Sequence, residues 1–251
     1  MSRFTGKTAL ITGAASGIGR ATAIRLGSEG ASLLLSDINE EGLAETTSLL
    51  APDVLSASTV LDVSDSASCQ AAVELCIERF GRLDVLCNIA GVLLFENITS
   101  ITDEQWRRTM GINLDGVFFM CRAAMPHLVE TKGNIVNMSS SAGLVGQAYN
   151  TAYCASKAGV LMLSKALALE YSGEEVRVNA VCPGTVRTSM VENFKVPEGA
   201  SMELIGRLTS PMLSEGVGPE QIAAGIAYLA SEEASYVTGT ALSIDGAQTA
   251  G

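Results

Sequence analysis

A glycine-rich turn between an apolar strand and a helix is the feature that most constrains how this chain can fold. Residues 7–12, KTALIT, predict a short buried strand, and the segment GAASGIGR follows with Gly13, Gly17 and Gly19 before a helical pattern that runs to Gly30. Glycines let a backbone approach a pyrophosphate closely, and a helix N-terminus offers free N–H groups with a partial positive charge. The spacing GxxxGxG differs from the commoner GxGxxG. Strand, turn and helix in this order favour a nucleotide site over a plain tight turn.

The second predicted strand points to the type of nucleotide. Residues 31–36, ASLLLS, form a continuous apolar run that is typical of a strand covered on both faces, and Asp37 follows it, eighteen residues past Gly19. A carboxylate in this place can accept both hydroxyls of an adenosine ribose and would repel a 2′-phosphate. Ser16 in the glycine turn offers no positive charge to such a phosphate. We therefore expect NAD rather than NADP, with a solvated aspartate at a strand end as the alternative interpretation.

Strands and helices alternate along the rest of the chain, and no repeat or linker interrupts them. We expect further strands at 55–61, 83–87, 134–138, 176–181 and 241–244, and helices at 40–50, 65–80, 103–132, 151–171 and 219–231. This alternation predicts right-handed βαβ units and a parallel sheet in a single α/β domain over residues 1–251. Ligands bind beyond the carboxyl ends of such strands, which would bring Gly13, Asp37, Asp62 and Asn88 to one edge.

Residues 189–217 interrupt the alternation, because they lose clear periodicity and contain Pro197 and Pro211. One interpretation is a mobile lid over a substrate, and the other is a surface excursion with a small core of its own. The periodicity does not choose between them.

The composition excludes several classes of function. The 251 residues carry a formal net charge of −11, which argues against a nucleic-acid or anionic-membrane partner. No apolar run reaches the roughly 18 residues of a membrane span without a charge, and the N-terminus enters a strand pattern without a signal peptide, so we expect a cytosolic protein. Six cysteines lack metal-binding spacing, and the single histidine, His127, lies in an amphipathic helix. We therefore expect no metal site, no histidine chemistry and reduced thiols.

Tyr153 and Lys157 are the best candidates for chemistry. They are four residues apart in a predicted helix, so they share one face, and Ser140 lies thirteen residues before the tyrosine. A lysine ammonium beside a phenol favours the phenolate and is expected to lower its pKa from about 10. The alternative is a half-buried tyrosine beside a surface lysine. Asn113 lies inside a predicted helix, where it could place an amide, hold water or cap a break.

Taken together, these motifs resemble the short-chain dehydrogenase/reductase family over essentially the whole chain. The matching segments are TGAASGIG at 12–19, Asp62 after the third strand, NxAG at 88–91, Asn113, Ser140, YxxxK at 153–157 and PGxxxT at 183–188. The resemblance implies a Rossmann fold, with a doubly wound seven-stranded parallel sheet and helices on both faces. It also implies an oxidoreductase that moves a hydride between NAD(H) and a secondary alcohol or ketone.

The resemblance further implies a tetrad of Asn113, Ser140, Tyr153 and Lys157. Tyr153 would be the acid/base on the substrate oxygen, and Ser140 would orient that oxygen. Lys157 would lower the pKa of Tyr153 and bind the nicotinamide ribose, and Asn113 would continue the proton path through a water. Ser139 and Ser141 compete with Ser140 by adjacency, but the thirteen-residue spacing selects Ser140.

The family pattern also gives the expected cofactor contacts. The N–H of Val186 and the hydroxyl of Thr188 would hold the carboxamide. The full expected set is Gly13, Ser16, Gly17, Ile18, Gly19, Asp37, Ile38, Asp62, Val63, Asn88, Ala90, Gly91, Tyr153, Lys157, Pro183, Gly184, Val186 and Thr188. One departure is Ile89, where the family usually has a second asparagine, so a polar contact is lost there.

The substrate and assembly are less defined. The substrate pocket is expected to be lined from residues 141–149 and from the 189–217 segment. Leu144, Val145, Gln147, Tyr149, Met190 and Phe194 suggest that it is apolar with one amide. Family resemblance suggests a homotetramer built through the helices near 114–131 and 151–171. A non-catalytic NAD-binding sensor or scaffold is the competing hypothesis, because one fold can host many functions. A related enzyme that uses the same site for dehydration or epimerisation is a third.

Overall fold

The computed structural model describes residues 2–192 and 195–250. Within them, seven strands form one sheet in which all pairs are parallel, in the order β3-β2-β1-β4-β5-β6-β7. The strands are β1 (Thr8–Thr12), β2 (Ser32–Asp37), β3 (Ser56–Val60), β4 (Val85–Asn88), β5 (Asn134–Met138), β6 (Arg177–Pro183) and β7 (Ala241–Ile244). The predicted doubly wound Rossmann sheet is confirmed.

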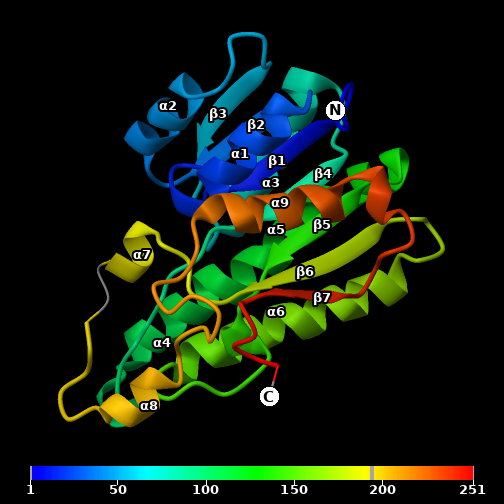
Figure 1. The fold of residues 1–251 in the computed structure, drawn as a ribbon. Helices are drawn as coiled ribbons and strands as arrows, with labels where there is room; N and C mark the ends of the chain where they lie inside the picture. Colours follow the sequence, from blue (N-terminus) through cyan, green and yellow to red (C-terminus); the bar gives the residue numbers. More distant parts are fainter. Residues whose placement is uncertain (1, 193–194, 251) are drawn as a thin grey trace.

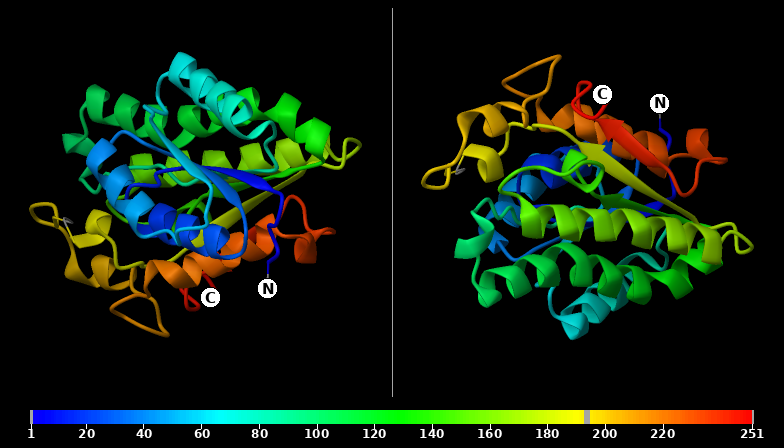
Figure 2. Two further views of the ribbon diagram at one scale, coloured as in Figure 1. Left: turned by 90° about the horizontal axis from the view of Figure 1, so that it is seen from above. Right: turned by 90° about the horizontal axis from the view of Figure 1, so that it is seen from below.

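Helices cover both faces of this sheet, as the views from above and below in Figure 2 show. On one face α1 (Gly17–Ser28) packs closely on α9 (Pro219–Ala230), and on the other α3 (Ser66–Phe80) packs on α5 (Gly116–Thr131). The central strands are buried on both sides, which explains their unbroken apolar runs. Two cores result, one on each face of the sheet.

The chain reverses its strand order between β1 and β4, since β2 and β3 extend the sheet in one direction and β4 to β7 in the other (Figure 1). Such a switch point leaves a crevice beyond the carboxyl ends of the strands, where α/β proteins bind ligands. α2 (Glu40–Ser48) follows β2 and is capped at its start by Asn39, whose side chain accepts a hydrogen bond from the N–H of Gly42.

The helix expected at 103–132 has a local change of pitch. α4 (Asp103–Met110) continues into a π-helical turn, Gly111–Asp115, and then into α5. This turn carries Asn113. Among the alternatives for this asparagine, the structure supports an amide placed by an irregular turn, since π-turns within helices re-aim side chains.

α6 (Thr151–Glu170) carries the Tyr153 and Lys157 pair and lies against β5 and β6. By length and composition alone, α6 could cross a membrane. Of its most apolar window, 39% is buried within the protein. Its buried residues include Lys157, and its exposed ones include Met162 and Leu169. The helix is therefore buried along one side only, and its other side carries apolar side chains.

The 189–217 segment contains two short helices, α7 (Ser189–Glu192) and α8 (Met202–Gly206). Both lie beyond the carboxyl ends of the strands, as the yellow and orange ribbons in Figure 1 show. After β7, the C-terminal residues return to this segment, where the N–H of Met212 donates to the carbonyl of Gly246 over 3.2 Å. The excursion thus lies over the functional edge of the sheet, as the lid interpretation requires.

Candidate active site

The glycine turn packs so closely that side chains are excluded from it. Gly13 has a φ of +71°. A Cβ on Gly19 would lie 1.9 Å from the carbonyl oxygen of Gly13. The first turn of α1 therefore lies directly against the end of β1, and the backbone of residues 16–19 lines an adjoining cleft. This is the local arrangement that a pyrophosphate requires.

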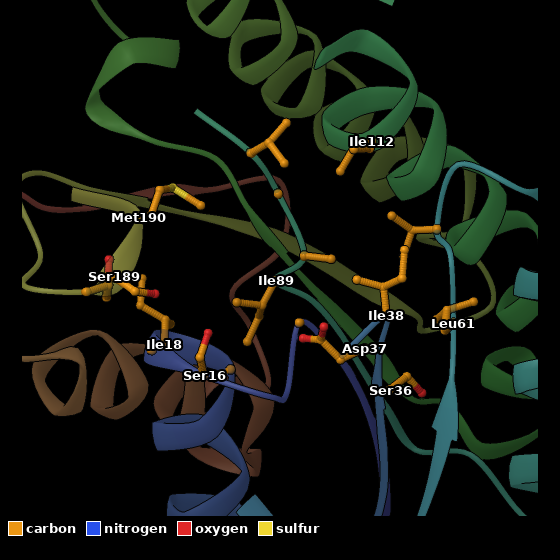
Figure 3. Close-up of a pocket in the computed structure, with 18 of the residues that line it drawn as sticks. Ser16, Ile18, Ser36, Asp37, Ile38, Leu61, Ile89, Ile112, Ser189 and Met190 are labelled. Carbon is orange, nitrogen blue, oxygen red and sulfur yellow. The ribbon is translucent and has the colours of Figure 1, made fainter. Parts of the chain in front are cut away.

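That cleft has a volume of about 740 Å³ and runs along the ends of β1, β2, β3 and β4 (Figure 3). In Figure 3, Ser16 and Ile18 lie at one side of it, Asp37 and Ile38 at its base, and Met190 across from Ile112. It brings together most of the expected cofactor residues, namely Gly13, Ser16, Gly17, Ile18, Gly19, Asp37, Ile38, Asp62, Val63, Ala90, Gly91 and Thr188.

The two carboxylates at the strand ends have ordered surroundings. Asp37 accepts hydrogen bonds from the N–H groups of Ala15 (3.1 Å) and Asn39 (3.0 Å), so it is tied to the glycine turn. Asp62 accepts from the N–H and the hydroxyl of Ser64. Next to Asp37, the buried hydroxyl of Ser36 lines the same cleft without a hydrogen-bond partner among the described residues. A cleft with a glycine cradle and a carboxylate at the end of β2 fits a dinucleotide.

Asn88 does not reach this cleft, although the sequence analysis expects it to contact the cofactor. It is 2% exposed and is absent from the residues that line the cleft. Its amide nitrogen donates to Asn137 Oδ1 over 2.9 Å and thereby joins β4 to β5 behind the site. The reason is the strand's length, since β4 extends through Asn88 and its side chain turns into the sheet layer. Thr12 supports the next residues, because its Oγ1 accepts from the N–H groups of Ile89 and Ala90.

A second pocket of about 310 Å³ adjoins the cleft and contains Ser140, Tyr153 and Lys157. The two cavities are lined in common by Ile18, Ile89, Gly91, Leu93, Thr188 and Met190. The remaining expected cofactor residues, Pro183, Gly184 and Val186, line this second pocket, which we call the reaction pocket. Because the two cavities share these lining residues, a molecule bound in the cleft lies next to the pocket that contains Tyr153.

Lys157 is a buried ammonium, with 3% of its surface exposed. Its Nζ donates to the carbonyl of Met138 over 2.9 Å and lies 5.6 Å from the centre of the Tyr153 ring. Burial lowers the pKa of Lys157 to about 8. The alternative of a surface lysine is wrong, because i to i+4 spacing on a helix packed against β5 directs the side chain inward.

The pKa of Tyr153 behaves differently from the sequence expectation. Burial raises the pKa of the phenol, and the hydrogen bond with Ser140 opposes that rise. The expected lowering of this pKa by Lys157 is not found, because burial of the phenol outweighs its hydrogen bond with Ser140. The protein alone thus keeps Tyr153 protonated at neutral pH.

The neighbouring serines have separate roles. Ser139 is buried, and its hydroxyl donates to the carbonyl of Lys157 over 2.8 Å. Ser141 is also buried and accepts from the Gln147 amide over 3.1 Å. Ser140 is half-buried, accepts from the N–H of Ala142 and remains open to the reaction pocket. The geometry therefore agrees with the spacing argument that selects Ser140.

Asn113 lies behind the reaction pocket rather than in its lining. It is fully buried, accepts from the N–H of Val92 (2.8 Å), and donates to the carbonyl of Val92 and the hydroxyl of Ser156. A Cβ on Gly91 would lie 3.2 Å from Asn113 Oδ1 and 3.4 Å from Lys157 Nζ. Gly91 therefore keeps the space between these two groups free of a side chain.

Some residues that were expected to line the substrate pocket do not line it. Gln147 and Met190 line the reaction pocket, whereas Leu144 and Val145 are exposed at its outside. Tyr149 packs on Phe95, and its hydroxyl accepts from the N–H of Ser201 over 2.7 Å. The expected contact of Phe194 lies outside the described residues.

Sequence reasoning missed several lining residues, because they come from segments without a motif. In the reaction pocket these include Asn150 and Gln248, whereas Ile205, Leu208 and Thr209 come from the 189–217 segment that was expected to line it. In the cleft they include Arg108 and Ile112, which α4 and the π-turn bring to its rim. Residues 2–192 and 195–250 contain no cluster of three or more His, Cys, Asp or Glu side chains that could hold a metal ion.

An α/β protein with a glycine cradle at the switch point, opening onto a serine, a tyrosine and a buried lysine, is built as a nicotinamide-dependent oxidoreductase. Residues 13–249 match the family model described as enoyl-(acyl carrier protein) reductase. The chain belongs to the short-chain dehydrogenase/reductase family.

Individual relatives agree with this assignment. The meso-2,3-butanediol dehydrogenase of Serratia marcescens is 38% identical over 248 residues, covering 99% of this chain and 96% of its own. A crystal structure of levodione reductase superposes with a TM-score of 0.90 at 39% identity, covering 99% of both chains. The carveol dehydrogenase of Mycobacterium avium, solved in complex with NAD, gives a TM-score of 0.89 at 33% identity over 98% of both chains.

Proposed function

We propose that this protein transfers a hydride between NAD(H) and a small secondary alcohol or ketone. The observation that carries the proposal is the junction of the two cavities, where Ser140, Tyr153 and Lys157 line the pocket that adjoins the dinucleotide cleft. The nicotinamide would supply the hydride acceptor or donor. The protein would supply orientation and a proton, and orientation of this kind can provide much of a rate enhancement.

Tyr153 is the proposed acid/base. Burial favours its neutral phenol, which suits proton donation to a carbonyl oxygen in reduction, and the Ser140 hydrogen bond favours the phenolate required for oxidation. Ser140 would hold the substrate oxygen. Lys157 would hold the nicotinamide ribose, and its lowered pKa of about 8 lets it exchange protons near neutral pH.

Asn113 is a positioning residue in this proposal. It holds the chain at Val92 and the α6 residue Ser156, on either side of Lys157. A water in the space beside Gly91 would link Asn113 to Lys157, as the family resemblance implies.

NAD is the proposed cofactor because of charge. Asp37 is fixed at the end of β2 by two backbone N–H groups and lines the cleft with no basic residue in the glycine turn itself, where Ser16 stands. A 2′-phosphate there would meet a carboxylate. The carveol dehydrogenase relative was solved with NAD, in agreement with this choice.

The assembly and setting are also proposals. Exposed apolar side chains on α5 and α6, namely Phe118, Met162 and Leu169, support a homotetramer built through these helices. The net charge of −11 supports a cytosolic protein that binds neither nucleic acid nor membranes. The substrate would have an apolar body, since Leu93, Met138 and Ile205 contribute to the pocket. Light scattering on purified protein would test the tetramer directly.

The first experiment is a thermal-shift titration with NAD(H) and NADP(H) side by side. A ligand that binds only the folded state raises the melting temperature by mass action. We expect a shift of several degrees with NAD(H) and a much smaller one with NADP(H) at equal concentration. No shift with either would bring the non-catalytic alternative forward, and a larger shift with NADP(H) would contradict the role of Asp37.

Tyr153→Phe tests the chemistry, because it removes one oxygen and keeps the ring. We expect turnover of secondary alcohols with NAD to fall by about 10³-fold or more, while the thermal shift with NAD(H) is retained. Tyr171→Phe, at the other end of α6, is the matched control and should leave turnover unchanged. Retained turnover in Tyr153→Phe would refute the proposed mechanism.

A further inference from the structure

Two residues in the middle of the glycine turn have every backbone polar group paired. Ala14 and Ala15 are buried, and the N–H of Ala14 donates to the carbonyl of Ser36 over 3.1 Å. The N–H of Ala15 donates to Asp37 Oδ2, also over 3.1 Å. Both alanine carbonyls accept hydrogen bonds from side chains on other parts of the fold. This part of the turn is therefore held by the protein before any ligand binds.

Thr46 on α2 holds the peptide that reaches Asp37. Its Oγ1 donates to the carbonyl of Ala14 over 2.8 Å, and this carbonyl belongs to the same planar peptide as the N–H of Ala15. The hydroxyl also lies 3.0 Å from the carbonyl of Gly42, but that carbonyl already accepts a hydrogen bond within the α-helix, so the single hydroxyl hydrogen is free for Ala14. One continuous series of hydrogen bonds thus runs from Thr46 through the peptide to Asp37.

Arg20 on α1 fixes both Thr46 and the next peptide. Its Nε donates to Thr46 Oγ1 over 3.0 Å, and its Nη2 donates to the carbonyl of Ala15 and to Glu45 Oε2, each over 2.6 Å. Nε carries one hydrogen and Nη2 carries two, so the guanidinium satisfies all three acceptors at once. Neither Arg20 nor Thr46 lines the cleft or the reaction pocket. A cofactor in the cleft would meet the turn that they hold and not these two side chains.

α2 also packs tightly against the turn. A Cβ on Gly42 would lie 2.8 Å from the Ala15 Cβ and 3.0 Å from the Ala15 carbonyl oxygen. At the start of the same helix, the N–H of Asn39 donates to Asp37 Oδ1 over 3.0 Å. The turn, Asp37 and the first half of α2 therefore form one packed unit.

We propose that Arg20 and Thr46 are positioning residues for cofactor selection, because they hold the peptide whose N–H fixes the Asp37 carboxylate. This inference rests on the proposed function, since the preference for NAD is part of it. A fixed carboxylate is ready to accept from ribose hydroxyls and to repel a 2′-phosphate. A carboxylate released by Ala15 keeps only the bond from Asn39, and ordering it again on binding costs affinity for NAD.

Thr46→Val tests the proposal without changing charge, because it replaces the hydroxyl by a methyl group. Titration calorimetry measures the Kd for NAD and for NADP. We expect the Kd for NAD to rise about fivefold and the Kd for NADP to stay nearly unchanged, so the preference for NAD falls about fivefold, as the loss of one hydrogen bond predicts. Thr46→Ser keeps the hydroxyl and should retain the preference. Thr47→Val is the matched control, because the Thr47 hydroxyl donates only to the carbonyl of Leu43 within α2.

Arg20→Leu separates positioning from charge. If Arg20 acted only as a cation near the cleft, its removal would weaken binding of NADP, the more negative dinucleotide, more than binding of NAD. We expect the opposite result, with NAD weakened more and the preference for NAD reduced about fivefold. Arg20→Lys keeps the charge but cannot supply the three N–H groups of the fork, so it should show the same loss. A stronger loss of NADP binding than of NAD binding in Arg20→Leu would overturn the proposal.

A double-mutant cycle tests whether Thr46 acts through Asp37. In the Asp37→Ala background the peptide has no carboxylate to hold, so adding Thr46→Val should change the Kd for NAD by no more than about twofold. The same loss in both backgrounds would overturn the proposal, because Thr46 would then only support the fold. An unchanged preference in Thr46→Val, or equal weakening of NAD and NADP, would overturn it as well.

These measurements also separate the inference from the proposed reaction, because binding requires no turnover. If the unmodified protein prefers NAD, loses that preference in Thr46→Val and oxidises no secondary alcohol, the positioning role stands and the proposed reaction fails. A protein that binds NADP as tightly as NAD would overturn the inference and leave hydride transfer intact. Binding of neither dinucleotide would overturn both.

Discussion

The cleft and the 189–217 segment are built in different ways. The cleft is formed by strand ends and a glycine turn that hold one another through short backbone contacts, such as Asp37 to the N–H of Ala15 and Thr12 to the N–H of Ile89. The 189–217 segment has two short helices and exposes large side chains, with Met202 68% and Met212 77% exposed. The first region is fixed by contacts between motifs, and the second by single hydrogen bonds to distant parts of the chain.

Single side-chain hydrogen bonds anchor the middle of the 189–217 segment, whereas its end is bonded to the backbone after β6, where the N–H of Val217 donates to the carbonyl of Thr185. Tyr149 accepts from the N–H of Ser201, Asn97 donates to the carbonyl of Glu198, and Ser210 donates to the carbonyl of Gly246. Local stability in proteins follows the density of such buried contacts. Under the proposed function, the cofactor would therefore be recognised at the sheet edge, whereas part of the substrate pocket comes from the less firmly held 189–217 segment.

Among the variants considered, Gly19→Ala should have the largest effect on stability and on NAD(H) binding, because the added Cβ would lie 1.9 Å from the Gly13 carbonyl oxygen. We expect the free energy of unfolding to fall by about 3 kcal/mol or more and the thermal shift with NAD(H) to disappear. Denaturant unfolding with and without NAD measures both. Gly146→Ala, beside the reaction pocket with no atom within 4 Å of the new Cβ, is the control and should be nearly neutral. Equal effects at both glycines would contradict the difference in packing.

Lys157→Met tests how much the buried ammonium of Lys157 lowers the free energy of unfolding. Because the folded pKa of Lys157 is about 8, below its unfolded value, the unfolded chain binds more protons between about pH 8 and 10.5, and the contribution of this residue to stability rises with pH in that window. We therefore expect Lys157→Met to be more stable than the original protein at pH 7 by roughly 3 kcal/mol, an advantage that shrinks towards pH 9.5.

Denaturant titrations at pH 7, 8.5 and 9.5 would measure this difference. Lys165→Met, on the exposed side of the same helix, is the control and should show no such pH dependence. A loss of stability in Lys157→Met at pH 7 would mean that the hydrogen bond to Met138 and the packing of the lysine outweigh its burial.

Asp37→Ala should change cofactor preference by about 10- to 100-fold without a large effect on turnover at saturating NAD. The carboxylate is lost from the cleft, so the repulsion of a 2′-phosphate disappears and one ribose contact goes with it. The ratio of kcat/KM for NAD and NADP measures the change. Asp53→Ala, an exposed aspartate outside the cleft, should leave the ratio unchanged. An unaltered ratio in Asp37→Ala would reduce Asp37 to a capping group for the glycine turn.

The same contrast explains what could be predicted from the sequence. The order of strands and helices, the seven-stranded sheet and the cleft residues from Gly13 to Asp62 follow from local motifs, because a strand end and the turn after it are adjacent in sequence. Asn88 was misplaced because β4 extends through it, and its side chain points into the layer between the sheet and α5, where it meets Asn137 and Cys121. Periodicity does not define a strand end that closely.

The reaction pocket was harder to predict for a different reason. Asn150, Ile205 and Gln248 line it from three separate segments, and only the tertiary fold brings them together. The raised pKa of Tyr153 is a further case, since spacing predicts that Lys157 is near but not the burial that raises the pKa of the phenol. Motifs therefore predicted the residues Ser140, Tyr153 and Lys157. Long-range packing determines the rest of the pocket that surrounds them.

Gly206→Ala should have the smallest effect, and it tests whether the 189–217 segment unfolds together with the sheet. Gly206 ends α8, and its new Cβ would have no atom within 4 Å. Alanine favours a helix over glycine, so the free energy of unfolding should rise by about 0.5–1 kcal/mol. Gly199→Ala is the matched comparison, because it has the same open space but a φ of +72°, and it should lower stability instead. Opposite signs in a denaturant titration would show that the segment contributes to global stability. Two neutral results would mean that the segment opens on its own, and the contrast between a rigid cofactor cleft and a loosely held cover would then be sharper than the contacts alone indicate.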